Sequence, residues 1–307
     1  GFPKELTCVS GAKARLLGPA AVSSLLPAVS PDAHKGTRGH VAVLAGSTGT
    51  VGAARLAATA AARSRAGVVT LHADAETYPI QAAALTSVMV SPWSEATDPA
   101  ELSGRFDSII VGPGWGIGPE RGAWLKRLLE QPLRGVLDAD AITLLGNDHS
   151  SWHPVAGSWV LTPHPGELSR ALSIPLAQVL SDPVEAATEL ATRLGAVVVL
   201  KGHVTYVIAP ERDIDEGSDE LAPRLSVIDG LQPWLATGGS GDVLAGVIGG
   251  ILAGGELTAY QAACAGVLIH AEAARNAYNA RGWFISEDLL DWVSRLVDCC
   301  EVSHDGC

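Results

Sequence analysis

Short, almost entirely apolar runs alternate along this chain with long alanine-rich stretches, and this alternation restricts the possible folds more than any other feature. The first unit consists of the apolar run His40–Ala45, the alanine-rich stretch Gly52–Ala66 and a second apolar run, Gly67–Leu71. Further apolar runs follow at Ser108–Val111, Gly135–Asp138, Trp159–Leu161 and Val197–Leu200. Strands without polar alternation are typical of parallel sheets that are covered on both faces. The pattern predicts an α/β fold with a mostly parallel central sheet and helices on both faces.

The two ends of the chain differ from this pattern. Residues 1–30 contain several prolines and few strand signals, which predicts a linker with a short lead-in helix. Near the other end, two consecutive long helices are predicted over Gly241–Ala253 and Ala259–Tyr278, packed as a layer over one face of the sheet. We therefore expect one domain over residues 31–298, followed by a tail at 299–307. Because the sequence starts at Gly1 and its only methionine is Met89, we expect it to be part of a longer or processed product.

Composition excludes several classes of partner. The chain has 307 residues, of which 47% are hydrophobic, and a net charge of -12. This charge argues against binding to nucleic acid or to an anionic membrane surface. The sequence contains neither the roughly 18 consecutive apolar residues of a membrane span nor a basic segment followed by an apolar core at its start. An odd number of cysteines, five, does not suggest a disulfide framework, so we expect a cytoplasmic protein.

A glycine-rich loop precedes the first of the two long helices. Residues Thr237–Asp242 read Thr-Gly-Gly-Ser-Gly-Asp and lead directly into an apolar stretch. Glycines allow several backbone N–H groups to face one anion, and the start of a helix adds unpaired N–H groups and a positive dipole end. The loop therefore predicts a phosphate site. Asp242 within it is either a helix cap or a base that takes a proton beside the phosphate.

Other glycine motifs follow predicted strands, at the edge where ligands bind in an open parallel sheet. The spacing Gly46-x-x-Gly49-x-x-Gly52 resembles a dinucleotide loop but does not match the Rossmann fingerprint. Gly112–Gly116 forms another turn, in which Gly114 would let a ligand approach the backbone. Its alternative is a tight turn with no ligand.

Polar side chains follow three more of the predicted strands. Asp140 is expected to cap the next helix, whereas Asp138 either caps it or organises magnesium through water. His164 lies between two prolines, which restrict its backbone, so it either points at a ligand or hydrogen-bonds within its own loop. Lys201, with Thr205 nearby, suits the phosphates or ribose of a nucleotide, and a second short strand is predicted after it at Tyr206–Ala209.

Taken in order, these motifs resemble those of the ADP-dependent NAD(P)H-hydrate dehydratases. The motifs are His34-Lys35-Gly36-Thr37-x-Gly39, Ala45-Gly46-Ser47, Gly112-Pro113-Gly114, Leu137–Ala141, Thr162–Glu167, Val199–Gly202 and Gly238–Leu244. The resemblance covers roughly Pro31–Leu290. It implies a ribokinase-like fold for the 31–298 domain, and it implies that residues 1–30 are a junction to an absent N-terminal NAD(P)H-hydrate epimerase domain.

The resemblance also implies an activity. These enzymes repair NADH and NADPH to which water has added: a phosphoryl group passes from ADP or ATP to the hydrate hydroxyl, and elimination of the phosphate ester restores the dihydropyridine. Asp242 is then expected to be the catalytic base, with magnesium neutralising the phosphates and no direct protein ligand to it beyond a water-mediated contact from Asp138. Homo-oligomers, often tetramers, are also implied.

Binding residues are transferred from the family position by position. Those expected at the hydrated nicotinamide nucleotide are Ala53, Gly114, His164 and Asp242. Those expected at the adenine nucleotide are Lys201, Gly202, His203, Val204, Thr205, Gly239, Ser240 and Gly241.

The chain departs from the family pattern just before the glycine loop. Many members have Asn-Pro-x-Gly-Asn there, whereas this chain has Ile228–Gln232 followed by Pro233 and Trp234. This puts the asparagine contacts of the family in doubt, and Trp234 either stacks on a ligand or packs within the protein.

Two other functions share parts of this pattern. A ribokinase-fold kinase of a vitamin precursor would have the same glycine loop and aspartate, but it would not require the His164 loop together with His34–Thr37. A nucleotide-binding regulatory domain without turnover would not require Asp242.

Overall fold

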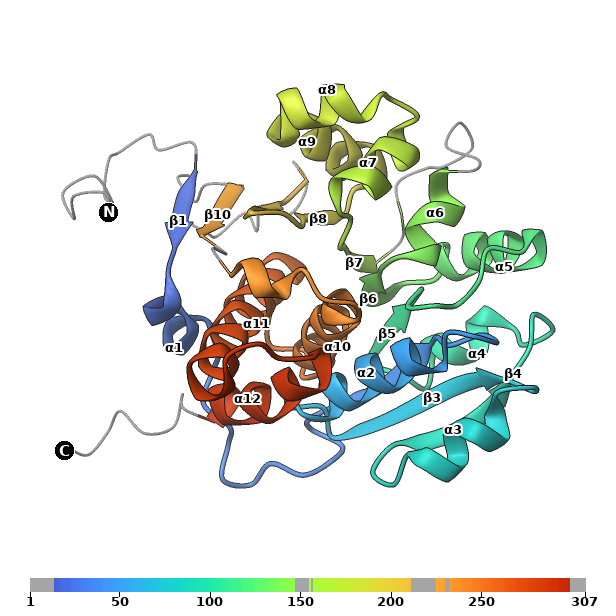
Figure 1. The fold of residues 1–307 in the computed structure, drawn as a ribbon. Coiled ribbons are helices and arrows are strands. Elements are labelled where there is room, and N and C mark those ends of the chain that lie inside the picture. The colour runs from blue at the N-terminus through green and yellow to red at the C-terminus, as the bar shows by residue number, and fades with distance from the viewer. Residues whose placement is uncertain (1–13, 147–154, 156, 211–224, 230–231, 299–307) are drawn as a thin grey trace.

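A ten-stranded sheet forms the centre of the molecule, with helices packed on both of its faces (Figure 1). A computed structural model describes residues 14–146, 155, 157–210, 225–229 and 232–298. The strand order is β1-β10-β9-β8-β7-β6-β5-β2-β3-β4. Neighbouring strands are parallel except at β9, which runs antiparallel to β8 and to β10. The predicted mostly parallel sheet is confirmed.

The strands extend over short segments of the chain. They are β1 (Arg15–Leu17), β2 (His40–Leu44), β3 (Val68–Asp74), β4 (Met89–Trp93), β5 (Ser108–Val111), β6 (Leu133–Leu137), β7 (Gly157–Leu161), β8 (Val197–Leu200), β9 (Val204–Ile208) and β10 (Leu225–Asp229). Three of them, β1, β4 and β10, were not predicted. The acidic composition of residues 210–223 predicts an exposed loop. This segment lies almost wholly outside the described residues, and the tail 299–307 lies entirely outside them.

Helices connect most of the strands. They are α1 (Val22–Leu25), α2 (Val51–Ala62), α3 (Tyr78–Ala84), α4 (Pro99–Ser103), α5 (Pro119–Leu129), α6 (Asp140–Gly146), α7 (Pro165–Leu172), α8 (Leu176–Ser181), α9 (Pro183–Leu194), α10 (Ser240–Ala253), α11 (Ala259–Arg281) and α12 (Ser286–Asp298), with 3-10 turns η2 (Pro19–Ala21) and η4 (Pro233–Leu235). The two predicted long helices correspond to α10 and α11. In the part of the chain that the structure describes, no helix is long and apolar enough to cross a membrane.

Each face of the sheet carries its own hydrophobic core, because successive side chains of a strand point to opposite faces. In β2, Val41 and Val43 pack into the core formed with α2, α10, α11 and α12. Ala42 and Leu44 of the same strand pack into the other core, which includes side chains of α5, α6, α7 and α9. The same alternation continues in the central strands. Both faces are buried, which explains why these strands are apolar throughout.

The order of the strands reverses between β2 and β5. The chain passes from β2 outward to β3 and β4 and then returns to place β5 on the other side of β2. The loops that follow β2 and β5 therefore meet: the Gly46 N–H donates to the Pro113 carbonyl at 3.0 Å and the Ser47 N–H to the Gly114 carbonyl at 2.7 Å. A crevice for ligands is expected at such a reversal.

Helix α10 packs unusually close to its neighbours because it carries glycines where they touch. A Cβ on Gly246 would overlap the carbonyl oxygen of Ala57 in α2. A Cβ on Gly249 would overlap the Ile110 side chain of β5. This contact fixes the height of α10 above the sheet, and thereby the position of the glycine loop at its N-terminus.

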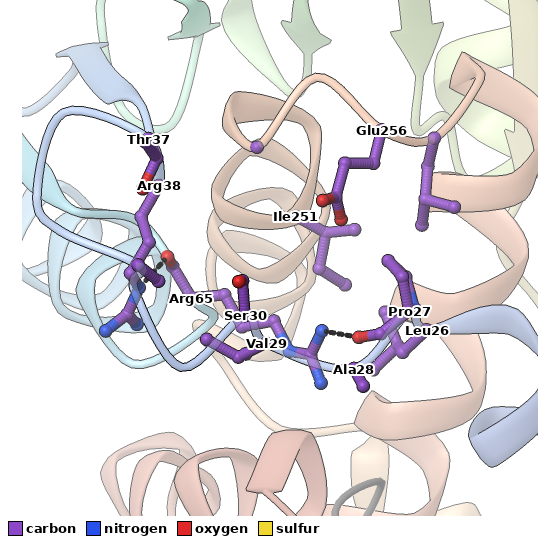
Figure 2. Close-up of a pocket in the computed structure, with 13 residues that line it drawn as sticks. Leu26, Pro27, Ala28, Val29, Ser30, Thr37, Arg38, Arg65, Ile251 and Glu256 are labelled. Atoms are coloured by element: carbon purple, nitrogen blue, oxygen red, sulfur yellow. Dashed lines mark hydrogen bonds between the residues drawn. The ribbon is translucent and has the colours of Figure 1, made fainter.

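The segment before β2 is held against the C-terminal helices. Arg65 donates to the carbonyl of Pro27, as Figure 2 shows. It also donates to the carbonyl of Val297, so one guanidinium joins the lead-in to the end of α12. A small cavity of about 110 Å³ lies beside it, lined by residues that include Leu26, Arg65 and Ile251. The lead-in helix was predicted, but β1 was not. β1 extends the sheet by pairing with β10.

The packing of α10 on α2 leads to a test. Gly246→Ala should lower the stability of the protein by about 1–3 kcal/mol, because the added methyl group meets backbone rather than a movable side chain. Gly122→Ala in α5 is the matched control, since its Cβ would make only an ordinary 3.7 Å contact with Leu144, and it should be neutral or stabilising. Thermal unfolding followed by circular dichroism would measure both. Equal effects of the two substitutions would contradict the packing argument.

Candidate active site

The glycine loop is held in place from two sides. Gly239 precedes α10 with φ 90°, a conformation that favours glycine, and a Cβ there would overlap Leu56. The Ser240 hydroxyl donates to the Leu235 carbonyl at 2.8 Å, and the Ser286 hydroxyl donates to the Gly238 carbonyl at 2.7 Å. The loop therefore presents the N-terminus of α10 in a fixed orientation, as an anion site requires.

A lysine and two carboxylates lie in front of this helix end. Lys201 Nζ is 2.8 Å from Asp138 Oδ1 and 3.7 Å from Glu167 Oε2. The Thr162 hydroxyl also donates to Asp138 Oδ1, at 2.7 Å. These residues follow β6, β7 and β8, whose carboxyl ends lie at one edge of the sheet. A Cβ on Gly241 would lie 3.3 Å from Lys201 Nζ, so the absence of a side chain lets the lysine approach the loop.

Charge balance keeps Lys201 protonated. Its partial burial would lower its pKa, but the carboxylates of Asp138 and Glu167 raise it by more, so the net shift is upward. Its side chain is 22% exposed, whereas that of Asp138 is 2% exposed. Lys201 is therefore a permanent positive charge beside the glycine loop.

Asp242 has the properties of a base. Burial, followed by the charge of Asp138, raises the pKa of Asp242 to about 7, and Lys201 offsets only part of this increase. A general base is most effective when its pKa is close to the working pH. The alternative role predicted for Asp242 is that of a helix cap. The N-cap position itself is Gly239, and Asp242 lies in the first turn of α10.

His164 is held as a neutral imidazole by its own loop. Its Nδ1 accepts hydrogen bonds from the backbone N–H groups of Gly166 and Glu167, at 3.0 and 3.3 Å. Burial lowers the pKa of His164, against the opposing charge of Glu167. The Glu167 carboxylate accepts from the backbone N–H of His164 at 2.8 Å, which completes a capping box on α7. The proton of the neutral ring is then on Nε2, which lies 3.4 Å from Glu167 Oε1. Both sequence alternatives for His164 are compatible with this arrangement.

A cleft of about 580 Å³ opens beside Lys201 and the glycine loop. Its lining includes these predicted residues: His164, Lys201, Gly202, His203, Thr205, Ser240 and Gly241. It also includes residues that the sequence analysis did not single out, among them Leu244, Val267, His270 and Ala271. The cleft has room for a nucleotide, with charged groups at one end and apolar side chains along its wall.

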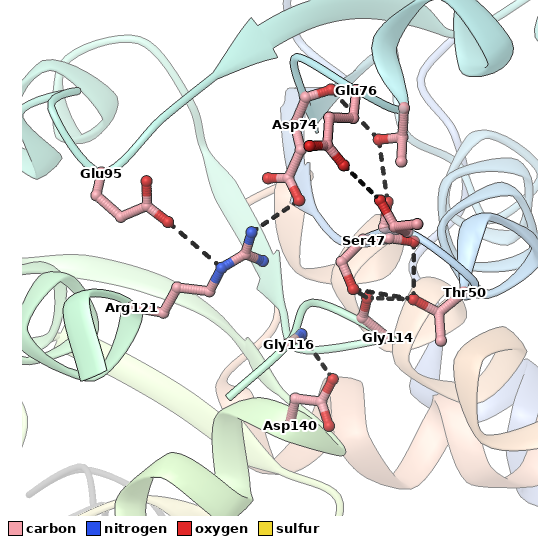
Figure 3. A network of polar contacts seen from close by, with 12 residues as sticks. Ser47, Thr50, Asp74, Glu76, Glu95, Gly114, Gly116, Arg121 and Asp140 are labelled. Atoms are coloured by element: carbon pink, nitrogen blue, oxygen red, sulfur yellow. Dashed lines mark hydrogen bonds and ion pairs between the residues drawn. The ribbon is translucent and has the colours of Figure 1, made fainter. Parts of the chain in front are cut away.

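A second group of predicted residues lies at the crevice between β2 and β5 (Figure 3). The Gly114 carbonyl accepts from the Thr50 hydroxyl at 2.7 Å and from the Ser47 hydroxyl at 3.1 Å. Gly114 has φ 55°, and a Cβ there would overlap Thr50. Ala53 is one turn further along α2, with its N–H donating to the Thr50 carbonyl. Five of the predicted binding residues do not line the cleft: Ala53, Gly114, Val204, Gly239 and Asp242. The last three adjoin lining residues in the sequence, whereas Ala53 and Gly114 form a separate group at the crevice.

Arg121 of α5 packs beside this second group (Figure 3). It forms ion pairs with Asp74 at 2.7 Å and Glu95 at 3.4 Å, and its guanidinium lies over the rings of Trp93 and Trp115. Such a partly buried, multiply bonded arginine restricts the loop that follows β5.

The structure corrects the prediction for Asp140 and decides between the two alternatives for Trp234. Asp140, expected to cap α6, uses Oδ2 to accept from the Gly116 N–H at 2.7 Å and thereby ties the loop after β5 to the loop after β6. Trp234 stacks on Tyr278, with ring centroids 3.6 Å apart and planes inclined by 4°, so it packs within the protein.

The site offers little direct coordination for a metal ion. No cluster of three or more potential metal-liganding His, Cys, Asp or Glu side chains occurs among the described residues. Asp138 Oδ1 is already engaged by Lys201 and Thr162. Its Oδ2 would be 3.9 Å from a Cβ on Gly241 and so faces the glycine loop. This donor set fits a magnesium ion held mainly by phosphate oxygens and water.

Comparison with known proteins identifies the family. Residues 41–295 match the model of the NAD(P)H-hydrate dehydratase family. The ADP-dependent (S)-NAD(P)H-hydrate dehydratase of Neisseria meningitidis is 36% identical over 250 residues, covering 79% of this chain and 78% of that protein.

The chain belongs to the NAD(P)H-hydrate dehydratase family.

Longer relatives show the same similarity in one half of their sequence. The bifunctional NAD(P)H-hydrate repair enzyme of Coxiella burnetii is 39% identical over 286 residues, which is 92% of this chain and 55% of that protein. The chain thus spans about half the length of the first curated relatives that it matches.

Solved structures confirm the fold. A ribokinase-like superfamily protein of Enterococcus faecalis superposes with a TM-score of 0.79 at 22% identity, covering 95% of this chain and 98% of that one. The ADP/ATP-dependent NAD(P)H-hydrate dehydratase of Bacillus subtilis, co-crystallised with ATP/Mg2+, has a TM-score of 0.77 at 26% identity, with coverages of 92% and 97%. The predicted ribokinase-like fold and family resemblance are confirmed.

The environment of Asp242 predicts a pH-dependent effect on stability. Its folded pKa of about 7 lies above the ordinary value of 3.8, so the folded state binds the proton more tightly and loses stability as pH rises towards 7. Asp242→Asn removes this loss. The variant should therefore gain more in melting temperature over the wild type at pH 8 than at pH 5.

Asp291→Asn is the control, because this carboxylate is 69% exposed on α12 and should show no such difference between the two pH values. Thermal melts of all three proteins would provide the comparison. A gain for Asp242→Asn that is the same at pH 5 and pH 8 would contradict an elevated pKa.

Proposed function

We propose that this protein dehydrates hydrated NADH or NADPH, using ADP or ATP as phosphoryl donor. The hydrate hydroxyl attacks the terminal phosphorus of the nucleotide, and the shortened nucleotide leaves. The C–O bond of the phosphate ester then breaks with loss of a ring proton, which yields inorganic phosphate and the dihydropyridine. Membership of the dehydratase family favours this reaction over phosphorylation of a vitamin precursor.

One observation carries the assignment of Asp242 as the base. A carboxylate with a pKa near 7 stands in the first turn of α10, beside backbone N–H groups that suit a phosphoryl group. Asp242 would take the hydroxyl proton as attack begins. The N–H groups of Gly239, Ser240 and Gly241 would stabilise the charge on the phosphoryl group during transfer.

The two groups of residues suggest where each ligand binds. The adenine nucleotide would occupy the cleft, with its phosphates between Lys201 and the glycine loop and with Gly202, His203, Val204 and Thr205 along the β8–β9 side. The hydrated nicotinamide nucleotide would bind at the crevice formed by Ala53 and Gly114, with His164 and Asp242 reaching it from the cleft side. Asp242 would then lie between donor and acceptor.

Magnesium would belong to the nucleotide rather than to a protein cage. Phosphate oxygens would supply most ligands, with Asp138 Oδ2 acting through water. The ion would neutralise phosphate charge when bound. Two protein residues would add to this. Lys201 would supply a cation held in place by Asp138, and the Thr162 hydroxyl orients Asp138.

Assembly and location remain predictions of the sequence analysis. We propose that the domain functions with an NAD(P)H-hydrate epimerase, as the bifunctional relatives suggest by their name and length, in a cytoplasmic homo-oligomer such as a tetramer. The boundaries at residues 31–298 are part of the same proposal.

The activity can be measured directly. The purified protein, incubated with hydrated NADH, magnesium and either ADP or ATP, should restore the absorbance of reduced nicotinamide and release inorganic phosphate. Hydrated NADPH should be tested in parallel. If neither nucleotide supports recovery with either hydrate, the proposed function is wrong.

Substitution of the base gives a sharper result. Asp242→Asn should retain nucleotide binding but lose about 10²- to 10⁴-fold in kcat, the loss typical of a removed general base. The Asp291→Asn control should keep wild-type kcat. Full activity of Asp242→Asn would show that this residue is a structural element of the helix start.

A further inference from the structure

The glycine loop begins with a β-turn whose central peptide joins two glycines. The turn spans Thr237–Ser240, and the Ser240 N–H donates to the Thr237 carbonyl at 3.4 Å. Gly239, the third residue of the turn, has φ 90° and ψ -9°. A type II turn has angles of about +80° and 0° at this position, whereas a type I turn has about -90° and 0°. The loop therefore adopts the type II form.

The same four residues could also form a type I turn. The two types differ mainly in the direction of the central peptide plane, which is set by ψ of the second residue and φ of the third. Glycine adopts either sign of φ, so the conformational preference of Gly239 does not exclude the type I form. Beyond its chain neighbours, no atom lies within 4 Å of the position that a Cβ on Gly238 would occupy, so packing at that position does not hold this residue. A contact from outside the loop is needed to select one turn.

Ser286, the first residue of α12, supplies such a contact. Its hydroxyl donates to the Gly238 carbonyl at 2.7 Å, and the residue is only 1% exposed. Ser286 is itself held in place, because Phe284 two residues before it is buried in the core and Asp288 accepts from the Ile285 N–H at 3.0 Å. A fixed donor on α12 therefore holds the carbonyl of the central peptide.

This hydrogen bond also determines where the other side of the peptide points. The described residues contain no cis peptide bond, and in a planar trans peptide the C=O and the N–H point in opposite directions. Ser286 lies on the carbonyl side, so the Gly239 N–H points away from α12. This N–H has no acceptor among the described residues, so it is available to an anion. In a type I turn, the Gly238 carbonyl oxygen would point to that side and would repel a phosphate.

We propose that Ser286 is a positioning residue for phosphoryl transfer: its hydroxyl holds the Thr237–Ser240 turn in the type II form and thereby directs the Gly239 N–H at the transferring phosphoryl group. Ser286 acts through the loop rather than on a ligand. The inference rests on the proposed function, which assigns the Gly239 N–H to that group. It connects catalysis to α12, a helix that carries none of the predicted site residues.

Steady-state kinetics of Ser286→Ala test this role, with hydrated NADH, magnesium and the nucleotide that supports wild-type turnover. Without the hydroxyl, part of the population should have the flipped peptide, and kcat should fall about tenfold, as expected for one lost hydrogen bond. This loss is smaller than the roughly 10²- to 10³-fold cost of removing a donor to the transition state. KM for both substrates should change less than about twofold, since an interaction made in the transition state affects kcat rather than KM.

Ser64→Ala is the matched control. Ser64 is also buried, and its hydroxyl donates to a backbone carbonyl, that of Ala60 in α2, at 2.6 Å. Because this bond lies outside the glycine loop, Ser64→Ala should keep the wild-type kcat, whatever its melting temperature. A wild-type kcat in Ser286→Ala, with or without a lower melting temperature, would overturn this inference alone, and so would a raised KM with unchanged kcat. A wild-type protein with no turnover would overturn the proposed function as well.

Ser286→Cys provides a second variant. Its thiol takes nearly the same space but is a weaker donor than the hydroxyl, so its kcat should lie between those of the wild type and Ser286→Ala. If Ser286→Ala does not fold, the comparison of Ser286→Cys with the wild type decides. Equal kcat values of these two proteins would then overturn the inference.

Discussion

The close packing of α10 on α2 and on β5 is the constraint on which the site depends. Because Gly246 and Gly249 have no side chains, the helix lies directly against backbone and sheet. Its N-terminus then ends at the edge where β6, β7 and β8 deliver Asp138, Thr162 and Lys201. Larger residues at Gly246 and Gly249 would push α10 outward and move the glycine loop away from Lys201. The position of the glycine loop is therefore set by two core glycines that lie one and two turns of α10 beyond Asp242.

At that edge, one lysine is shared among several acids. Asp138 and Glu167 hold Lys201 charged, while the charge of Asp138 also raises the pKa of Asp242. In the proposed reaction, the same carboxylate would hold Lys201 in place for the phosphates and would keep the pKa of Asp242 near neutral pH. The two carboxylates differ in their partners. Asp138 is almost fully buried but paired with Lys201 and Thr162, whereas Asp242 has no such hydrogen bond or ion pair among the described residues, and burial is the main cause of its raised pKa.

The sequence identified the central strands and the loops at their carboxyl ends, because strands covered on both faces are apolar throughout and the motifs follow them directly. It did not identify β1 and β4, which lie at the two edges of the sheet, since edge strands lack this pattern; β4 includes Pro92 and the half-exposed Met89. It also could not distinguish motifs that lie at the site from motifs that lie elsewhere in the fold. The His34–Thr37 segment forms a turn beside Gly39, which packs against Ala253 at the far end of α10 from Asp242.

Residues such as His270 show why part of the site was inaccessible to sequence reasoning. A single histidine in an apolar, alanine-rich helix is read as a core residue, and by burial it is one. What places it at the site is its position on the wall of the cleft, beside Leu244 and Val267. That position arises only when α11 packs against α10, two segments with no shared sequence pattern. Local spacing predicts where backbone donors gather, whereas the side chains that form the rest of the cleft wall are defined by the tertiary fold.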